Sequence, residues 1–300
     1  MRSHQDWSSP GWSLAPVAPV TGPFPHRPFL KAAAETVSRG EPLFVENEEG
    51  FLALARWDDQ VEMLGAPDFT DYHSPLGPGV IDLVSELRLS LGGRWRLDSL
   101  PAEAAAVICK GLDAAGEGAE PVQHELAMVL ELPRSFDDYL ERLGKKERHE
   151  LRRKVRRFEL AVGEVRLESH STPNEQVLTE FVRLHRLSAG AKGGFLTPAV
   201  ETLFRSLSEQ PGWQVELLRG PDGPAVAAAF AYQDGMGYYL YNSGYDPTVA
   251  QASPGLVLLA SLIERSIENS LQYFDFLKGD EDYKARLGAR PRPLYSVEVG

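Results

Sequence analysis

A cluster of charged and phenolic side chains follows an apolar stretch near the end of the chain. Residues 273–277 have the pattern of a buried strand, and the segment after them holds Lys278, Asp280, Tyr283 and Lys284. A phenol can donate a proton, a carboxylate can receive one through water, and an ammonium attracts an anion. Such a set suits a transfer to an amine, in which a leaving group takes up a proton. It is equally the composition of a solvated salt-bridge cluster, and both readings stay open.

A second candidate site lies where a helix begins. Residues 254–269 have helical apolar spacing, Ser253 stands in the N-cap position, and Pro254 occupies the first turn. Free backbone N–H groups and the helix dipole favour an anion at such a start. Gly255 would let a phosphate approach the backbone closely, with Leu256 beside it. The alternative is an ordinary Ser-Pro helix start that binds nothing.

A predicted strand at 238–242 carries tyrosines and an asparagine. Alternation along the strand places Tyr239 and Tyr241 on one face and Asn242 on the other. Tyr241, Asn242 and the following Tyr245 are candidates for positioning an acceptor. Tyrosines of this kind also pack in protein cores with a satisfied hydroxyl group.

His185, on a predicted amphipathic helix, is the best candidate for a general base, and its alternative is a partly buried structural histidine. The single cysteine, Cys109, excludes an internal disulfide and a cysteine-based zinc site. The sequence has no recognisable Ser-His-Asp or Cys-His arrangement and no metal-ligand spacing. We therefore expect no metal and no covalent enzyme intermediate.

The most basic part of the chain is residues 141–159, which hold nine Lys or Arg and four Glu. The whole chain has a net charge of −12, so this segment is a cationic patch on an acidic protein. The acidic total argues against DNA binding but leaves one local anion site possible. Leu151, Val155 and Phe158 form an apolar stripe at helical spacing. The cations then either lie on a solvent-exposed helix face or bind phosphate groups.

The composition, with 43% hydrophobic and 25% charged residues, is that of a soluble globular protein. No stretch approaches the ~20 apolar residues of a membrane span, and no secretory signal is recognisable. We therefore expect a cytoplasmic protein, and 300 residues allow two domains. Residues 1–28 contain six prolines and little periodic pattern, which predicts an extended or disordered leader.

Apolar periodicity and turn residues predict the elements between these sites. Helices are expected at 32–38, 80–91, 101–112, from a capping box at 135–138 onward, after an N-cap at Thr172, after Thr197, at 254–269 and at 281–287. Strands are expected at 42–45, 51–55, 61–64, 95–97, 124–132, 164–169, 213–218, 225–232, 238–242, 273–277 and 294–299. The order in the second half, β-α-α-β-β-β-α-β-α-β, predicts a mixed α/β (α+β) fold.

Short motifs within this order carry a resemblance. They are residues 145–154, 239–246, 253–256 and 274–280, then Tyr283-Lys284 and Leu287-Gly288, with weaker support from 68–76. Together they resemble the acetyltransferase-like family that includes the cellulose-biosynthesis protein CelD and is related to the FemAB transferases. The resemblance implies a GNAT acyl-CoA N-acyltransferase fold, in a tandem of two GNAT-like domains. The expected parts are an N-terminal domain at 29–134, a basic connecting helix at 135–160 and a C-terminal acyltransferase domain at 161–300.

The resemblance also assigns a donor site. It implies that the pyrophosphate of acetyl-CoA or another acyl-CoA binds at Gln251, Ser253, Gly255 and Leu256. The loop departs from the usual GNAT pattern, because Gly255 follows Gln251 by four positions rather than three. Pro254 also removes one N–H donor.

Roles for Tyr283 and Lys284 follow from the same resemblance. Tyr283 would protonate a leaving thiolate, and Lys284 matches a FemAB lysine near the donor's phosphates. Asp280 would orient either residue or receive the proton of the amine, with His185 as a further base. The acceptor would contact Tyr241, Asn242, Tyr245 and Lys278.

The resemblance implies an N-acyltransferase that acts on a small-molecule amine or an amino sugar. One alternative is a FemAB-like transferase that uses aminoacyl-tRNA, with the basic helix in contact with tRNA. Another is a catalytically inactive GNAT scaffold that serves as a binding module, which the altered loop at 251–255 suggests.

Overall fold

The computed structural model describes residues 1–188, 195–221 and 223–300 and divides into two compact units. Unit 1 is Met1–Ala127 with Arg292–Gly300, and unit 2 is Met128–Pro291. The chain passes from one unit to the other within two strands, β6 (Val122–Glu131) and β12 (Arg290–Val299). These boundaries differ from the expected ones at 134 and 161. The apolar face of the basic helix packs into the core of unit 2, and most of the final strand belongs to unit 1.

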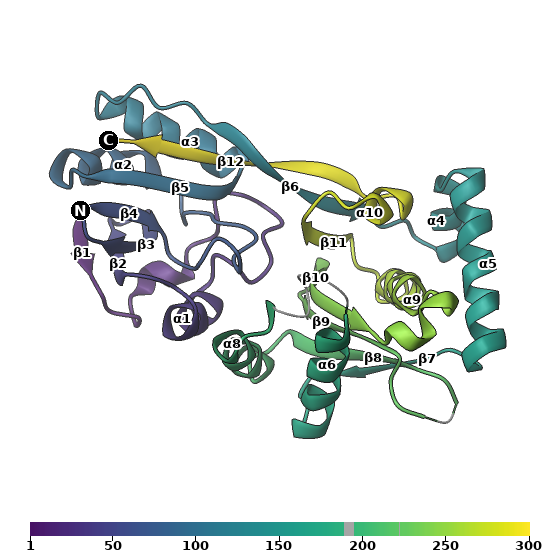
Figure 1. Ribbon diagram of the computed structural model, residues 1–300. Coiled ribbons are helices and arrows are strands. Elements are labelled where there is room, and N and C mark those ends of the chain that lie inside the picture. The colour runs from purple at the N-terminus through teal and green to yellow at the C-terminus, as the bar shows by residue number, and fades with distance from the viewer. Residues whose placement is uncertain (189–194, 222) are drawn as a thin grey trace. The chain divides into compact units, whose positions relative to one another are not determined.

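Unit 1 is a mixed sheet with helices (Figure 1). Its elements are β1 (Arg2–His4), η1 (Pro10–Ser13), α1 (Arg27–Thr36), β2 (Glu41–Glu46), β3 (Phe51–Trp57), β4 (Gln60–Met63), α2 (Val80–Ser90), β5 (Arg94–Pro101) and α3 (Ala102–Ala114). The strand order is β1-β2-β3-β4-β5-β12, and β4 and β5 are parallel. The expected hairpin at 42–55 is confirmed, because β2 and β3 pair antiparallel around the Asn47–Gly50 turn.

Residues 1–28, expected to be an extended or disordered leader, are ordered in the structure. β1 pairs with β2, and the Phe24 side chain is fully buried against Phe29 and Tyr72. Prolines deprive this segment of N–H donors, but its carbonyl groups still accept hydrogen bonds, including two from the Arg292 guanidinium. Burial of aromatic side chains therefore orders a segment without regular periodicity.

Unit 2 contains the second half of the expected order. Its elements, besides the shared strands, are α4 (Phe136–Arg142), α5 (Lys145–Val162), β7 (Arg166–His170), α6 (Glu175–Leu187), α8 (Pro198–Ser208), β8 (Trp213–Arg219), β9 (Ala227–Gln233), β10 (Gly237–Tyr245), η2 (Pro247–Ala252), α9 (Pro254–Glu268), β11 (Tyr273–Lys278) and α10 (Asp282–Arg286). The strand order is β6-β11-β10-β9-β8-β7. The mixed α/β fold class is confirmed.

Local capping signals place several helix starts in unit 2. The Ser135 hydroxyl accepts from the Asp138 N–H at 3.1 Å, and the Thr197 hydroxyl accepts from the Val200 N–H at 3.4 Å, as expected. The cap expected at Thr172 is wrong, because Asn174 accepts from the Val177 N–H at 3.0 Å and α6 begins one residue later. Asparagine is the better cap, and Pro173 precedes it outside the helix.

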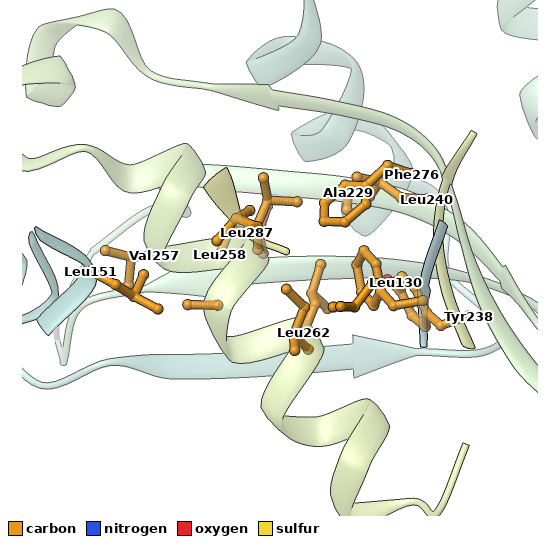
Figure 2. Packing of buried hydrophobic residues seen from close by; sticks show 14 of the residues in the cluster. Leu130, Leu151, Ala229, Tyr238, Leu240, Val257, Leu258, Leu262, Phe276 and Leu287 are labelled. Atoms are coloured by element: carbon orange, nitrogen blue, oxygen red, sulfur yellow. The ribbon is translucent and has the colours of Figure 1, made fainter. Parts of the chain in front are cut away.

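The two faces of the unit 2 sheet carry different helices. Ala229 and Ala231 of β9 lie in a core with α9 and α5, and Figure 2 shows Leu151, Val257 and Leu258 in that cluster. Phe230, between the two alanines, contacts Phe181 of α6 and Phe204 of α8 on the opposite face. The basic helix α5 therefore packs beside α9, as Figure 1 also shows.

Candidate functional site

The parallel pair at the centre of the unit 2 sheet opens after a short paired stretch. β10 and β11 pair only through Gly237–Tyr239 and Tyr273–Asp275. Beyond this point the Asp275 carboxylate accepts the Leu277 N–H at 2.8 Å, and Leu277 has a left-handed backbone with φ of 59°. The pairing between β10 and β11 therefore ends before β11 itself ends at Lys278.

A bulge in β10 changes which of its side chains face α9. The register with β9 pairs Leu240 with Ala231 but Asn242 with Phe230, so Tyr241 is the extra residue. Residues opposite each other in a register share a face. Ser243 and Tyr245 therefore face α9, whereas Asn242 shares the α6–α8 face with Tyr241. The expectation that Asn242 lies on the face opposite Tyr241 is wrong because of this bulge.

A cavity of ≈ 360 Å³ lies between β10, α9 and α10. Its lining residues come from five elements or their ends: Lys154, Ser188, Ser243, Tyr245, Gly255, Leu256, Leu259 and Tyr283. An adjoining cavity of ≈ 170 Å³ under α5 shares Lys154, Leu256 and Tyr283 with it and adds Lys146 and Arg286. Together they form a cleft with apolar walls, hydroxyl groups and ammonium groups, as small-molecule sites commonly have.

The start of α9 forms one wall of the larger cavity. Pro254 has no N–H, and the Leu256 and Val257 N–H groups both donate to the Ser253 carbonyl. Within residues 1–188, 195–221 and 223–300, the Gly255 N–H has no acceptor. An ideal Cβ on Gly255 would lie 3.4 Å from Cδ1 of Tyr245, so the tyrosine ring flanks this N–H. The helix start thus offers one open donor and its dipole to the cavity.

Ser253 and Gln251 do not line the two cavities. Ser253 has a left-handed backbone with φ of 57°, and its side chain forms no capping bond, unlike the expected N-cap. Gln251 is exposed, and its amide oxygen accepts from the Arg157 guanidinium of α5 at 3.3 Å. Gly255 and Leu256 are therefore the expected donor-loop residues that reach the cleft.

Tyr283 is the expected catalytic residue that lines both cavities. Burial raises the pKa of its phenol above the ordinary value, and the nearby Glu281 carboxylate adds to the increase. The phenol is therefore protonated at neutral pH and can donate that proton.

Lys284 lies elsewhere. Its side chain is buried at 2% exposure, and its ammonium donates to the carbonyl oxygens of Lys278 at 2.6 Å and Gly279 at 3.0 Å. The Glu281 carboxylate lies 2.9 Å away. These contacts occupy the ammonium within its own loop, so Lys284 does not line the cleft as expected for a residue near donor phosphates. Asp280 is exposed, and Lys278 is half-buried outside the cavity lining.

His185 and Tyr241, two other expected site residues, lie on the face of β10 that is covered by α6 and α8. His185 is 1% exposed and packs against Phe181. An ideal Cβ on Gly244 would lie 2.6 Å from Cα of His185, which places the histidine on the face that Gly244 presents. Tyr241 packs against Trp213 and Phe204. His185 and Tyr241 are thus packing residues, and the cavity lies on the other face.

The structure adds residues that sequence reasoning missed. Lys154 was visible only as one cation among nine, and nothing local marked it as facing a cavity. Ser243 reaches the cleft through the bulge, which the sequence pattern does not disclose. Ser188 ends α6, and its hydroxyl accepts the Tyr245 N–H at 3.3 Å. In the described ranges, three or more potential metal ligands do not gather in one place. Within the same ranges, every helix is too short or too polar to span a membrane.

Comparison with known proteins identifies the domain around this cleft. Residues 145–285 match the family model described as an acetyltransferase (GNAT) domain. No curated protein sequence matches the chain.

Solved structures share the fold over most of the chain. FemX has a TM-score of 0.67 at 11% identity, covering 99% of this chain and 97% of its own. L-PGS from Bacillus licheniformis has a TM-score of 0.60 at 12% identity, covering 94% and 92%. A DUF2156 C-terminal domain from Agrobacterium fabrum, described as part of a lysylphosphatidylglycerol synthetase, has a TM-score of 0.62 at 13% identity, covering 91% and 86%. At such identities the likeness concerns the fold alone.

Proposed function

We propose that the chain is an N-acyltransferase with acyl-CoA, first of all acetyl-CoA, as its donor, because residues 145–285 match the model of an acetyltransferase (GNAT) domain. The acceptor is an amine of a small molecule or an amino sugar. One observation carries the proposal: a single cavity beside β10 is lined by Tyr283 and by Gly255, whose N–H has no acceptor among the described residues. The motifs described above support kinship with CelD-like and FemAB-related proteins, and use of acyl-CoA supports a cytoplasmic location.

The charges around the α9 start suit a phosphate-bearing donor. Pro254 and the Ser253 carbonyl leave one N–H without an acceptor among the described residues, which is fewer than a helix start usually presents. Lys154 lines the cavity, and Arg157 lies at the adjoining loop through its bond to Gln251. These α5 cations would supply the attraction for phosphate that the backbone lacks.

The reaction needs no covalent enzyme intermediate. The neutral amine forms a bond to the acyl carbon, and the carbon–sulfur bond of the thioester breaks. Tyr283 donates its phenol proton to the departing sulfur, and the amine loses its proton to solvent. The open N–H at the α9 start and the α5 cations hold the donor while this occurs.

Binding of acetyl-CoA measured by isothermal titration calorimetry tests the donor. We expect saturable binding that Lys154→Ala weakens by about 10-fold to 150-fold, since one charge-assisted contact is worth roughly 1.5–3 kcal/mol. Lys110→Ala, which removes an exposed lysine of α3, is the matched control and should bind as the native protein does. No heat of binding for acetyl-CoA or a longer acyl-CoA at millimolar concentration would refute the acyl-CoA proposal.

The same titration should give one donor per chain. In unit 1 the parallel pair β4–β5 also opens after three residue pairs, near Ser99 with φ of 56°. There the chain itself occupies the free edge of β5, because the His73 N–H donates to the Ser99 carbonyl at 2.9 Å. The His73 ring lies 2.9 Å from the Asp98 carbonyl. A stoichiometry of two would contradict this reading of unit 1.

A second donor class is aminoacyl-tRNA. It is supported by the solvent face of α5, which exposes Lys145, Lys146, Arg152, Arg153, Arg156 and Arg157, and by the fold shared with FemX. We expect the chain to bind tRNA with an affinity that falls by about 10³-fold between roughly 50 and 200 mM salt. The Arg152→Glu/Arg156→Glu variant should bind tRNA less tightly than the native protein. The double variant should retain acetyl-CoA binding, since both arginines line a different groove. Salt-insensitive or absent tRNA binding removes this candidate.

A further inference from the structure

The turn between β11 and α10 is built around one ammonium group. The Lys284 ammonium lies 2.6 Å from the Lys278 carbonyl, 3.0 Å from that of Gly279 and 3.4 Å from that of Leu277. Three successive carbonyl groups of the chain therefore converge on a single point. The Glu281 carboxylate, at 2.9 Å, completes the set.

This convergence depends on the backbone of the turn. Leu277 has φ of 59° and Gly279 has φ of 102°, and both values bend the chain into the left-handed region. Carbonyl dipoles aimed at one point repel each other unless a cation lies between them. The ammonium is buried at 2% exposure, so it depends in turn on these acceptors to offset its lost hydration. Lysine and turn therefore stabilise each other.

The turn sets the position of the residue next to Lys284. α10 has only five residues, Asp282–Arg286, which is too short to be stable without tertiary contacts. Tyr283 belongs to that helix, lines both cavities and packs edge-on against Phe276, with ring centroids 6.3 Å apart. The ammonium contacts the turn and does not line the cleft. Lys284 can therefore influence the reaction only indirectly, through the position of Tyr283.

We propose that Lys284 is a positioning residue whose ammonium holds the 277–281 turn so that the Tyr283 phenol stays inside the cavity. The proposal rests on the function proposed above but concerns a different contact from donor binding. It predicts that loss of the ammonium displaces the phenol and lowers turnover, while the affinity for the donor is preserved.

The first measurement follows the ionisation of the phenol at position 283 and does not require an active enzyme. Fluorotyrosine at position 283 reports its own titration by ¹⁹F NMR. In native protein the phenol should titrate above free fluorotyrosine, because it is buried. In Lys284→Ala it should shift toward the free value and return when n-propylammonium, which matches the deleted atoms, is added. Lys110→Ala should not change the signal. An unchanged titration in Lys284→Ala would overturn the proposal.

The second measurement separates turnover from binding. We expect Lys284→Ala to lower kcat by about 10-fold to 100-fold with the acetyl-CoA Kd unchanged, and propylammonium to restore kcat partly. Turnover of the native protein in the same concentration of propylammonium is the control, because propylamine could itself be acylated. If Lys284→Ala does not fold, Lys284→Gln, which keeps two N–H donors, takes its place in both measurements. A raised Kd with unchanged kcat would instead show direct donor contact. A native protein without activity would refute the proposed function and leave the ¹⁹F result to decide this inference.

Discussion

Replacing Tyr283 with phenylalanine is expected to lower kcat by about 100-fold, because the departing sulfur loses its proton donor. The donor KM should change little, since phenylalanine keeps the contact with Phe276 and the cavity wall. Steady-state kinetics with acetyl-CoA and a panel of amines and amino sugars measure both constants. Tyr273→Phe, at the opposite end of β11, is the matched control and should behave as the native enzyme does.

The pH dependence of kcat tests the same role of Tyr283. The active form of the phenol is protonated, so kcat should fall only as pH rises through the pKa of Tyr283. Burial and Glu281 raise that pKa, so native kcat should hold through pH values at which an exposed tyrosine ionises, roughly pH 10. A fall in kcat between neutral pH and that value, absent in Tyr283→Phe, would contradict the raised pKa.

Filling the space beside Gly255 is expected to abolish donor binding. Gly255→Phe places a ring in the cavity between the α9 start and Tyr245, and we expect the acetyl-CoA Kd to rise at least about 100-fold. Calorimetric titration measures this change, and thermal unfolding checks that the fold persists. The test addresses the helix start directly, because the side chain stands on the residue whose N–H is open.

Gly255→Ala is the control for this prediction. An ideal Cβ there would meet Tyr245 at 3.4 Å, an ordinary van der Waals distance, so alanine should fold normally. Its donor Kd should rise only a few-fold. Full donor affinity in Gly255→Phe would place the donor away from the start of α9.

Local signals in the sequence were sufficient for most helices and strands. The β2–β3 hairpin and the caps at Ser135 and Thr197 follow from interactions between residues close in the chain. The GNAT resemblance of the C-terminal half, carried by motifs in their order, agrees with the family match over residues 145–285. The ordered leader was missed because its burial depends on residues far along the chain, including Arg292.

The site itself was only partly predictable. Tyr283, Gly255, Leu256 and Tyr245 line the cleft, and their roles in binding and catalysis stay predictions. Ser243 faces the cleft, and Asn242 does not, because a single extra residue in β10 inverts the alternation of side chains. A bulge is a property of the pairing with β9, so β10 alone does not reveal it.

Charge was the least predictable property. The amino-acid sequence determined that Lys154, Lys278 and Lys284 carry ammonium groups and that one segment is basic. Tertiary packing decided that Lys154 lines the cavity and that Lys284 is enclosed by carbonyl groups of its own turn. The physical reason is range: propensities and caps act within a few residues, whereas the partner of a long charged side chain is whichever acceptor the folded chain brings within reach.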